Sequence, residues 1–267
     1  GATLTFAQAA IAYGQAAHDD RFLDRVEDYW KDTLVPKITG EGIRQMACKL
    51  YPGAANATLN RQGIVPAQAI INYAADLEWC ARIRVKRFKV NAKRKTPATR
   101  GWVEAFAQQA VQDELNHLAA LCLFMFSTGA RRGEACALTW GDVELFQKKA
   151  VIKQTKVDDQ RIAHLSPPVI AALANIPSNR NPDSLVFQYA SGESVGQVWN
   201  NVIERAGIEK LSPHCCRHGF ATSMPQAGID PKTVAVRGGW KDVGTVMKFY
   251  AHAMDDLTVT DVLFGTK

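Results

Sequence analysis

The sequence predicts a mainly α-helical protein with one small β-hairpin or sheet, organised in two domains. The chain has 267 residues, enough to bury two apolar cores. Apolar residues recur at helical spacing through most of it, and a run of basic residues separates two apolar regions. We therefore expect a helical domain over residues 1–82, a basic linker over 83–100, and a mixed α/β domain over 101–267.

Helical patterns fill the first domain, with glycine and proline between them. Helices are expected at about 6–13, 21–30, 42–50 and 66–81. Gly40, Pro52-Gly53 and Gly63 are expected to interrupt them. These elements predict a small α domain.

The second domain begins with a long helical pattern from Glu104 to about Ser127, which Thr128-Gly129 ends. A new helix is expected to start near Arg131. Two short β-leaning runs surround a polar turn and predict a hairpin with Lys156 near its tip. Helices are then expected at about 167–175, 194–206, 213–226, 231–237 and 243–251.

Charge favours a polyanionic partner, because the net charge is +6 and the pI is near 9.0. No acidic residue lies between Trp79 and Val103, whereas nine basic residues do. A solvated linker and a segment lying along a DNA backbone are both compatible with this run. The candidate DNA contacts are Arg82, Arg84, Lys86, Arg87, Lys89, Lys93, Arg94, Lys95 and Arg100, together with Arg132.

Cysteine spacing argues against a zinc site or a disulfide framework. The six cysteines form no C-x-x-C pair, and most lie in apolar runs, as expected for reduced thiols of a cytosolic protein. The acidic residues are scattered and predict no two-metal cluster. We expect no metal, no cofactor, no signal peptide and no membrane span.

The segment 211–218 predicts a phosphate site. Ser212 can cap a helix that starts at Pro213, which places His214 and Arg217 three residues apart on one face of its first turns. A helix N-terminus and a guanidinium both favour an anion. A histidine and an arginine at this spacing more often form a surface or capping pair. The other motifs therefore decide between that role and a phosphate site.

Three motifs resemble those of the tyrosine recombinases, the phage-integrase family. The stretch 128–142 resembles the first signature box, matching Gly129, Arg131, Glu134, Leu138 and Asp142. His214-Cys-Cys-Arg-His218 resembles the second box. Gly239-Trp240 followed by Phe249-Tyr-Ala-His252 resembles the segment that carries the nucleophile. The resemblance implies a helical core-binding domain followed by a mixed α/β catalytic domain.

The resemblance also implies roles for individual residues. Arg131 and Arg217 would hold the scissile phosphate, Tyr250 would attack it, and His214 and Trp240 would donate to its oxygens. Lys156 would be the general acid, with Lys153 as its competitor. Trp240 stands where histidine is usual, and its indole N–H can still donate one hydrogen bond. Glu134, Asp142 and His218 would support these groups.

The residue chemistry is compatible with the same assignment. A pentacoordinate phosphorane carries more negative charge than the diester, so two guanidinium groups stabilise it selectively. Tyrosine has an ordinary pKa near 10, and Tyr250 needs cationic neighbours or a base to act as a nucleophile. A 3′-phosphotyrosine would store the diester energy without ATP.

The expected partner is double-stranded DNA at attachment sites of a prophage or other mobile element. The chain would be a monomer when free, a homotetramer on DNA, cytoplasmic and bound to the nucleoid, with accessory DNA-bending proteins as further partners. A type IB topoisomerase-like relaxer and a DNA-binding relative that no longer cuts are the alternatives. The apolar tail 255–264 is expected to dock on a neighbouring subunit, with docking on its own domain as the alternative.

Overall fold

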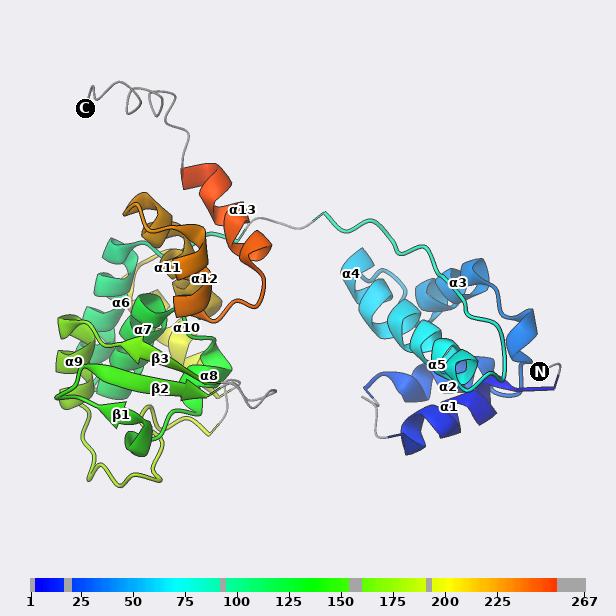
Figure 1. Ribbon diagram of the computed structural model, residues 1–267, viewed down its shortest axis with the longest axis horizontal. Helices are drawn as coiled ribbons and strands as arrows, with labels where there is room; N and C mark the ends of the chain where they lie inside the picture. The colour runs from blue at the N-terminus through cyan, green and yellow to red at the C-terminus, as the bar shows by residue number, and fades with distance from the viewer. Residues whose placement is uncertain (1–2, 17–20, 92–94, 154–159, 191–193, 254–267) are drawn as a thin grey trace, which may run out of the picture. The chain divides into compact units, whose positions relative to one another are not determined.

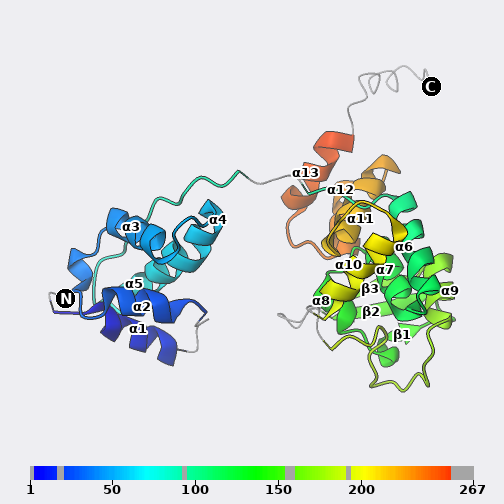
Figure 2. The same ribbon diagram turned by 180° about the vertical axis from the view of Figure 1, so that it is seen from behind.

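The chain folds into two compact units, Gly1–Lys93 and Arg94–Lys267, each with its own core (Figures 1 and 2). The predicted mainly helical fold with one small sheet is confirmed. The two units are described separately below. The computed structural model describes residues 3–16, 21–91, 95–153, 160–190 and 194–253.

Helices of the first unit surround an apolar core that includes the fully buried Phe6, Ile43 and Ile70. A capping box starts the first helix, because the Thr5 hydroxyl accepts from the Gln8 N–H while the Gln8 side chain accepts from the Thr5 N–H. The elements are α1 (Phe6–Gln15), α2 (Leu23–Trp30), the 3-10 turn η1 (Val35–Lys37), α3 (Gly40–Leu50), α4 (Asn56–Leu59) and α5 (Val65–Asp76).

Gly63 lies inside a helix, not at the predicted interruption. A π-helical turn, η2 (Asn60–Ile64), joins α4 directly to α5. A Cβ at Gly63 would come 2.6 Å from the Cβ of Ala47 on α3, so glycine is needed where these helices meet. The predicted helix end near residue 81 is also wrong, since α5 ends at Asp76.

A three-stranded antiparallel sheet and several helices make up the second unit. Strands β1 (Val143–Glu144), β2 (Lys149–Lys153) and β3 (Gln160–His164) follow in the order β1-β2-β3. The hairpin predicted from sequence is confirmed by the pairing of Lys149 with His164 and of Lys153 with Gln160.

The single helix predicted over 104–127 is two helices, α6 (Arg100–Gln112) and α7 (Asn116–Thr128). Glu114 adopts a left-handed φ of 61° between them. The Leu115 N–H donates to Ala110 O at 2.8 Å and the Glu114 N–H to Val111 O at 3.0 Å. This is the Schellman pattern with glutamate in place of glycine, so no glycine in the sequence marks the break.

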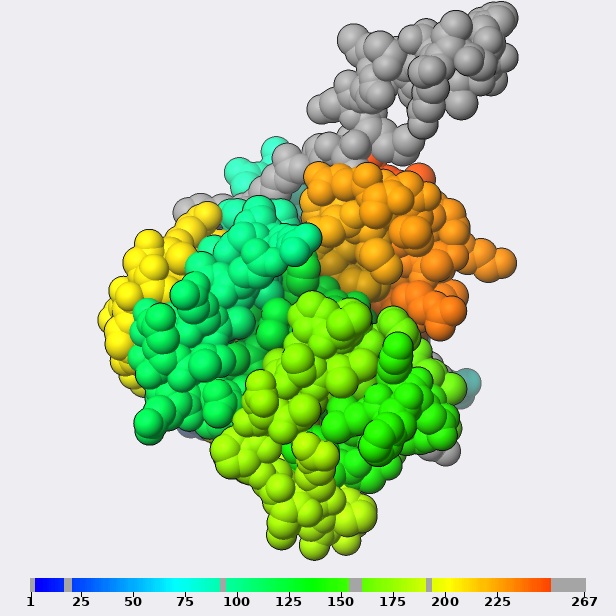
Figure 3. All heavy atoms as spheres, turned by 90° about the vertical axis from the view of Figure 1, so that its left-hand side faces the viewer, coloured from blue at the N-terminus to red at the C-terminus, as the bar shows by residue number. Residues whose placement is uncertain are grey.

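The last three helices share a small core, formed by Phe220, Val234, Ala235, Val246 and Tyr250. In Figure 3 their orange surface lies beside the green surface of the sheet region, and α12 contacts β3. No helix among the described residues is long and apolar enough to cross a membrane. The remaining elements of this unit are α8 (Arg132–Cys136), the 3-10 turn η3 (Trp140–Asp142), α9 (Pro167–Ala174), α10 (Val195–Ala206), α11 (His214–Gln226), α12 (Pro231–Gly238) and α13 (Val243–Ala253).

Candidate active site

Arg131 stands in the turn between α7 and α8. Gly129 ends α7 with a left-handed φ of 66°, and a Cβ there would come 2.8 Å from the Phe220 ring, so the turn requires glycine. Arg131 is the N-cap residue of α8, in agreement with the helix start predicted near it. Its side chain is 44% exposed, which leaves the guanidinium accessible to a ligand.

The Glu134 carboxylate binds both the backbone and the side chain of Arg131. One carboxylate oxygen accepts from the Arg131 N–H at 3.0 Å and the other from Nη1 at 2.5 Å. Arg161 Nη2 also donates to Glu134, at 3.0 Å. Burial alone would raise the pKa of Glu134, but the hydrogen bonds from Arg131 and the charge of Arg161 lower it. Glu134 is therefore a buried carboxylate shared by two guanidinium groups.

Arg217 is almost completely buried, with 3% of its surface exposed. Nη1 donates to the carbonyls of Gly129 and Gly238, the latter at 2.5 Å, and the guanidinium lies 3.6 Å from the centre of the Trp240 ring. Nη2 is buried with no partner among the described residues. Burial, and next the positive charge of Arg131, lower the pKa of Arg217 to about 9. An anion placed at Nη2 would satisfy this donor and offset the burial of the charge.

His214 starts α11 beside these arginines. Its ring makes an edge-on contact with His218, with 4.8 Å between the ring centres. The side chain of His214 is partly open to solvent, and four cationic or titratable groups act on it through their charges. Loss of hydration, and then the charges of His218, Lys95, Arg217 and Arg131, lower the pKa of His214 to about 4. His214 is thus neutral at pH 7, with one N–H to donate and one nitrogen to accept.

His218 and Trp240 line the same region. His218 Nε2 is buried without a partner among the described residues, and burial lowers the pKa of this imidazole as well. Trp240 stacks on Phe220 and follows Gly239, whose φ is 68°. The Trp240 ring also packs against Gly238, where a Cβ would come 1.9 Å from it. The two glycines therefore allow the indole to cover Arg217.

Tyr250 lies on α13 and is 8% exposed. Its hydroxyl donates to the Ile229 carbonyl, and its ring belongs to the small core of α11 to α13. Burial, and then the negative charge of Asp230, raise the pKa of Tyr250. The cationic neighbours expected from the sequence do not offset these two effects in the observed conformation. Tyr250 is here a neutral phenol.

Asp142 caps a turn and pairs with Lys153, one of the two candidate lysines. Asp142 accepts from the N–H and the hydroxyl of Thr139 and so caps η3. Lys153 Nζ donates to the same carboxylate at 2.6 Å, and these bonds lower the pKa of Asp142 although burial opposes them. Lys156 lies outside the described residues. Arg132, half-buried on α8, follows Arg131 directly in the chain.

Sequence reasoning missed Arg161. This residue lies on β3, two and four residues before Ala163 and Leu165, so its side chain is on the same face of the strand as these two buried residues. An arginine on the buried face of a strand is the signal that could have indicated it, because a buried charge needs a partner. Its hydrogen bond to Glu134 places it at the same carboxylate that holds Arg131.

The first half of the predicted linker is bound to the first unit by a row of amides, here called the amide row: Asn56, Asn60, Gln68 and Asn72. These residues are four or eight apart on α4, η2 and α5, and therefore lie on one face of the continuous helix. Asn72 accepts from the Ile83 N–H, Gln68 from the Val85 N–H, and Asn60 from the Phe88 N–H. Asn56 donates to the Lys89 carbonyl at 2.8 Å.

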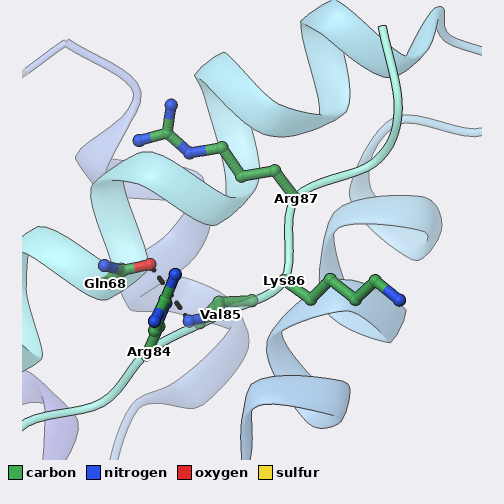
Figure 4. Close-up of a pocket in the computed structure, with 5 residues that line it drawn as sticks. All are labelled: Gln68, Arg84, Val85, Lys86 and Arg87. Carbon is green, nitrogen blue, oxygen red and sulfur yellow. Dashed lines mark hydrogen bonds between the residues drawn. The ribbon is translucent and has the colours of Figure 1, made fainter.

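The amide row holds the backbone and leaves the basic side chains free to point outward. Gln68, Arg84, Val85, Lys86 and Arg87 line a pocket in which Lys86 and Arg87 point in opposite directions (Figure 4). Val85 is buried, whereas the three basic residues are exposed. The segment 83–89 is thus an ordered, extended part of the first unit that carries cations on its surface.

The other basic residues predicted to contact DNA are either paired with an acidic residue, exposed, or outside the described residues. Arg82 pairs with Asp76, and Arg100 pairs with Glu104 at 2.7 Å. Lys89 and Lys95 are exposed, and Lys93 and Arg94 lie outside the described residues. Ala98 is buried in the second unit, where its N–H donates to Cys215 O at 3.0 Å.

Comparison with known proteins agrees with the sequence motifs. Residues 103–256 match the profile of the phage integrase family, which is more than half of the chain. The chain belongs to the phage integrase family. The integrase of Salmonella phage P22 is 26% identical over 214 residues, covering 72% of this chain and 55% of that protein. Tyrosine recombinase XerD of Neisseria meningitidis serogroup A is 32% identical over 145 residues, covering 50% and 49%. The chain thus spans about half the length of these two relatives.

Solved structures show the same fold at low sequence identity. The Tn1549 transposon integrase in complex with transposon right end DNA matches with a TM-score of 0.75 and 17% identity, covering 99% of this chain and 100% of that chain. A lambda integrase dimer bound to a COC′ core site matches with a TM-score of 0.70 and 14% identity, covering 92% and 77%. The predicted tyrosine recombinase fold is therefore confirmed.

Proposed function

We propose that this chain is a site-specific DNA recombinase that cleaves and rejoins DNA through a 3′-phosphotyrosine intermediate. The observation that carries the proposal is Arg217, a buried guanidinium with an unpartnered Nη2, next to the accessible Arg131. Such a pair costs free energy in the free protein and is stabilised when an anion arrives. A phosphodiester that becomes more negative in the transition state fits this arrangement best.

Arg131 and Arg217 would bind the two non-bridging oxygens of the scissile phosphate. His214, neutral at pH 7, would donate its N–H to one of them and accept the proton of the attacking hydroxyl at its other nitrogen. Trp240 would keep Arg217 in place through its ring and keep water away from it. The arginines thus supply the charge stabilisation and His214 the proton transfer.

Tyr250 would attack the phosphorus after its hydroxyl leaves the Ile229 carbonyl. The bond from Tyr250 Oη to phosphorus forms while the bond from phosphorus to the 5′-oxygen breaks, and the diester energy is retained in the phosphotyrosine. Breaking one hydrogen bond to a neutral carbonyl costs about 0.5–1.5 kcal/mol, which frees the hydroxyl. Any movement of the ring out of the small core adds the loss of its apolar burial.

Lys156 would give a proton to the leaving 5′-oxygen. Lys153, its competitor, donates to Asp142 at 2.6 Å and would have to break that ion pair first. This pairing supports Lys156, which lies between β2 and β3 in the sequence. A lysine carried on a hairpin turn can approach the DNA as the complex forms.

Double-stranded DNA at attachment sites is the proposed substrate, and the ordered basic segment would contact its phosphates. The solved integrases of Tn1549 and lambda are bound to DNA, which supports this partner. We propose that the protein is a monomer when free and a homotetramer on paired sites. In the sequence, the core-binding unit, 1–82, precedes the linker and the catalytic unit, 101–267, follows it. Phage and transposon integrases among the relatives favour a prophage or mobile element as the source.

Trapping on a nicked suicide substrate tests the proposal. Wild-type protein should form a denaturant-stable adduct with a 3′-phosphotyrosine and a free 5′-hydroxyl. Tyr250→Phe should bind the same half-site with near-unchanged affinity and form none, because only the hydroxyl is lost. An adduct formed by the Phe variant, or a 5′ linkage, would exclude this mechanism.

Trapping excludes one of the two alternatives, and the other needs a further measurement. A non-cleaving DNA-binding protein is favoured by the Tyr250 bond to Ile229, and it would form no adduct with wild-type protein. A type IB topoisomerase-like enzyme would form the adduct as a monomer and would relax supercoiled plasmid without a specific site. Recombination of two paired sites distinguishes the proposed recombinase from both.

A further inference from the structure

Arg161 connects the strand β3 to the group of residues that holds the two phosphate-binding arginines. Its side chain is 10% exposed. Nη2 donates to the Glu134 carboxylate at 3.0 Å and Nε donates to the Arg237 carbonyl at 3.2 Å. Nη1 is buried and has no partner among the described residues. A guanidinium in this position holds two elements together by separate nitrogens.

Three consecutive carbonyls at the end of α12 each accept from a different arginine. Arg237 O accepts from Arg161, Gly238 O from Arg217 at 2.5 Å, and Gly239 O from Arg131 at 3.3 Å. The last carbonyls of a helix lack partners within the helix and carry the negative end of its dipole. The end of α12 therefore fixes three cations relative to one another.

Glycine at position 239 lets Arg161 reach this turn. A Cβ on Gly239 would come 2.7 Å from Arg161 Nη1, and the φ of 68° also favours glycine. The guanidinium thus packs against the backbone that carries the acceptor for Arg131. Any shift of Arg161 changes the support of Glu134 and of this turn together.

We propose that Arg161 is a positioning residue for strand cleavage, which sets the geometry of Arg131 through Glu134 and that of Arg217 through the end of α12. The inference rests on the proposed function, since it concerns the rate of the same phosphoryl transfer. Arg161 itself stays behind the phosphate-binding pair and makes no contact with DNA. Its effect is on the placement of the charges that stabilise the transition state.

The test compares Arg161→Ala and Arg161→Lys with wild type in three measurements. These are the thermal unfolding midpoint of the free protein, the half-site affinity with its salt dependence, and the single-turnover rate of adduct formation. Arg205→Ala is the control of equal charge change, because Arg205 pairs with Asp113 at 2.7 Å in the same unit. Tyr250→Phe gives the background rate.

Arg161→Ala should slow adduct formation about 100-fold, the effect expected when catalytic groups shift by about 1 Å. Its half-site affinity and salt slope should stay at the wild-type values. Arg161→Lys should lie between wild type and Ala, because one ammonium keeps the charge beside Glu134 but cannot supply two separately placed nitrogens. If the Ala variant does not fold, the Lys variant decides, with an expected loss of about 10-fold. The control should cleave at the wild-type rate.

A double-mutant cycle with Glu134→Gln examines the route of the effect. If Arg161 acts through Glu134, the double variant should cleave no more slowly than about the slower single variant. Additive losses would overturn the proposal, as would a wild-type rate in folded Arg161 variants. A salt slope reduced by about 0.9 would instead make Arg161 a direct phosphate contact. Absence of adduct with wild-type protein would refute the proposed function itself, and is thereby distinguished from failure of this inference.

Discussion

His214 is held neutral by its surroundings, and this has a measurable consequence for stability. Its pKa is lowered from an ordinary value near 6.5 to about 4, first by burial and then by neighbouring cations. Below the unfolded value the unfolded chain binds a proton that the folded chain does not. Unfolding is therefore favoured as the pH falls from about 6.5 toward 4, and the contribution of His214 to stability is lost over that window.

We predict that the free energy of unfolding falls more for wild type than for His214→Gln when the pH is lowered from 7 to 5. The difference in stability between the two proteins should therefore narrow or reverse. Glutamine keeps a donor and an acceptor but does not titrate. Urea unfolding at the two pH values measures the effect, and the imidazole resonance of His214 should titrate near pH 4 in NMR spectra of the free protein. His164, whose side chain is exposed on β3, provides the control in His164→Gln. A His214 midpoint near 6.5 would contradict the prediction.

Contacts close in the sequence were predictable at this scale, and distant ones were not. Glu134 follows Arg131 by three residues at a helix start, a spacing that itself favours their contact. The burial of Arg217 depends on the carbonyls of Gly129 and Gly238, which come from other elements. Arg161 meets Glu134 because the sheet packs against α8 through β2 and against α12 through β3, and no local pattern contains that fact.

The basic run shows what the composition of an element leaves open. Nine bases without an acid predict either a solvated linker or a DNA contact. The amide row decides part of this, because it fixes 83–89 as an extended segment on the first unit. Amides at four-residue spacing on one helix were visible in the sequence. Their partner was not, since side-chain amides bond many backbone groups equally well.

Cations held on a fixed backbone should contact phosphates at a lower entropic cost than those of a free linker. We predict that changing Arg84, Lys86 and Arg87 together to Gln reduces the slope of log affinity against log salt by up to about 2–3 units. Neutralising Lys93, Arg94 and Lys95 should have a similar effect. Site preference should change little in either case, because phosphate contacts carry no base information.

Two comparisons make this measurement specific. Arg205→Gln is the first control, because Arg205 on α10 pairs with Asp113 within the second unit. This variant should not change the salt slope. Asn60→Ala removes both bonds to Phe88 while it keeps every charge, so it should weaken binding with a slope near that of wild type. Slopes unchanged by both triple substitutions would return the run to the interpretation as a solvated linker.

At the scale of the whole molecule, the fold was predictable because two apolar regions flank one charged run. Helix breaks were less predictable. The junction at Glu114 uses a non-glycine residue at positive φ, and Gly63 is kept for close packing against Ala47 and does not interrupt the helix. In both places tertiary contacts outweigh the local preference that sequence patterns report.

The tail 255–264 lies outside the described residues, and its sequence makes a prediction about assembly. Leu257, Val259, Val262, Leu263 and Phe264 are apolar, and burying each contributes about 1.5–3 kcal/mol. A terminus with that much apolar surface is expected to dock on protein. Docking on a neighbouring subunit would couple the release of Tyr250 to assembly, since the tail begins five residues after it.

Deleting the residues after Asp256 should therefore weaken tetramer formation on paired sites and change the rate of cleavage. Half-site binding by the monomer and the unfolding midpoint of the free protein should stay nearly constant, because no contact of the monomer core is lost. Sedimentation of the protein with paired-site DNA and thermal unfolding without DNA measure the two effects. Changing Leu263 and Phe264 to Ser in the full chain tests the apolar contact without shortening the chain. A truncated monomer that unfolds at a much lower temperature would show that the tail packs on its own domain, and docking between subunits would then be rejected.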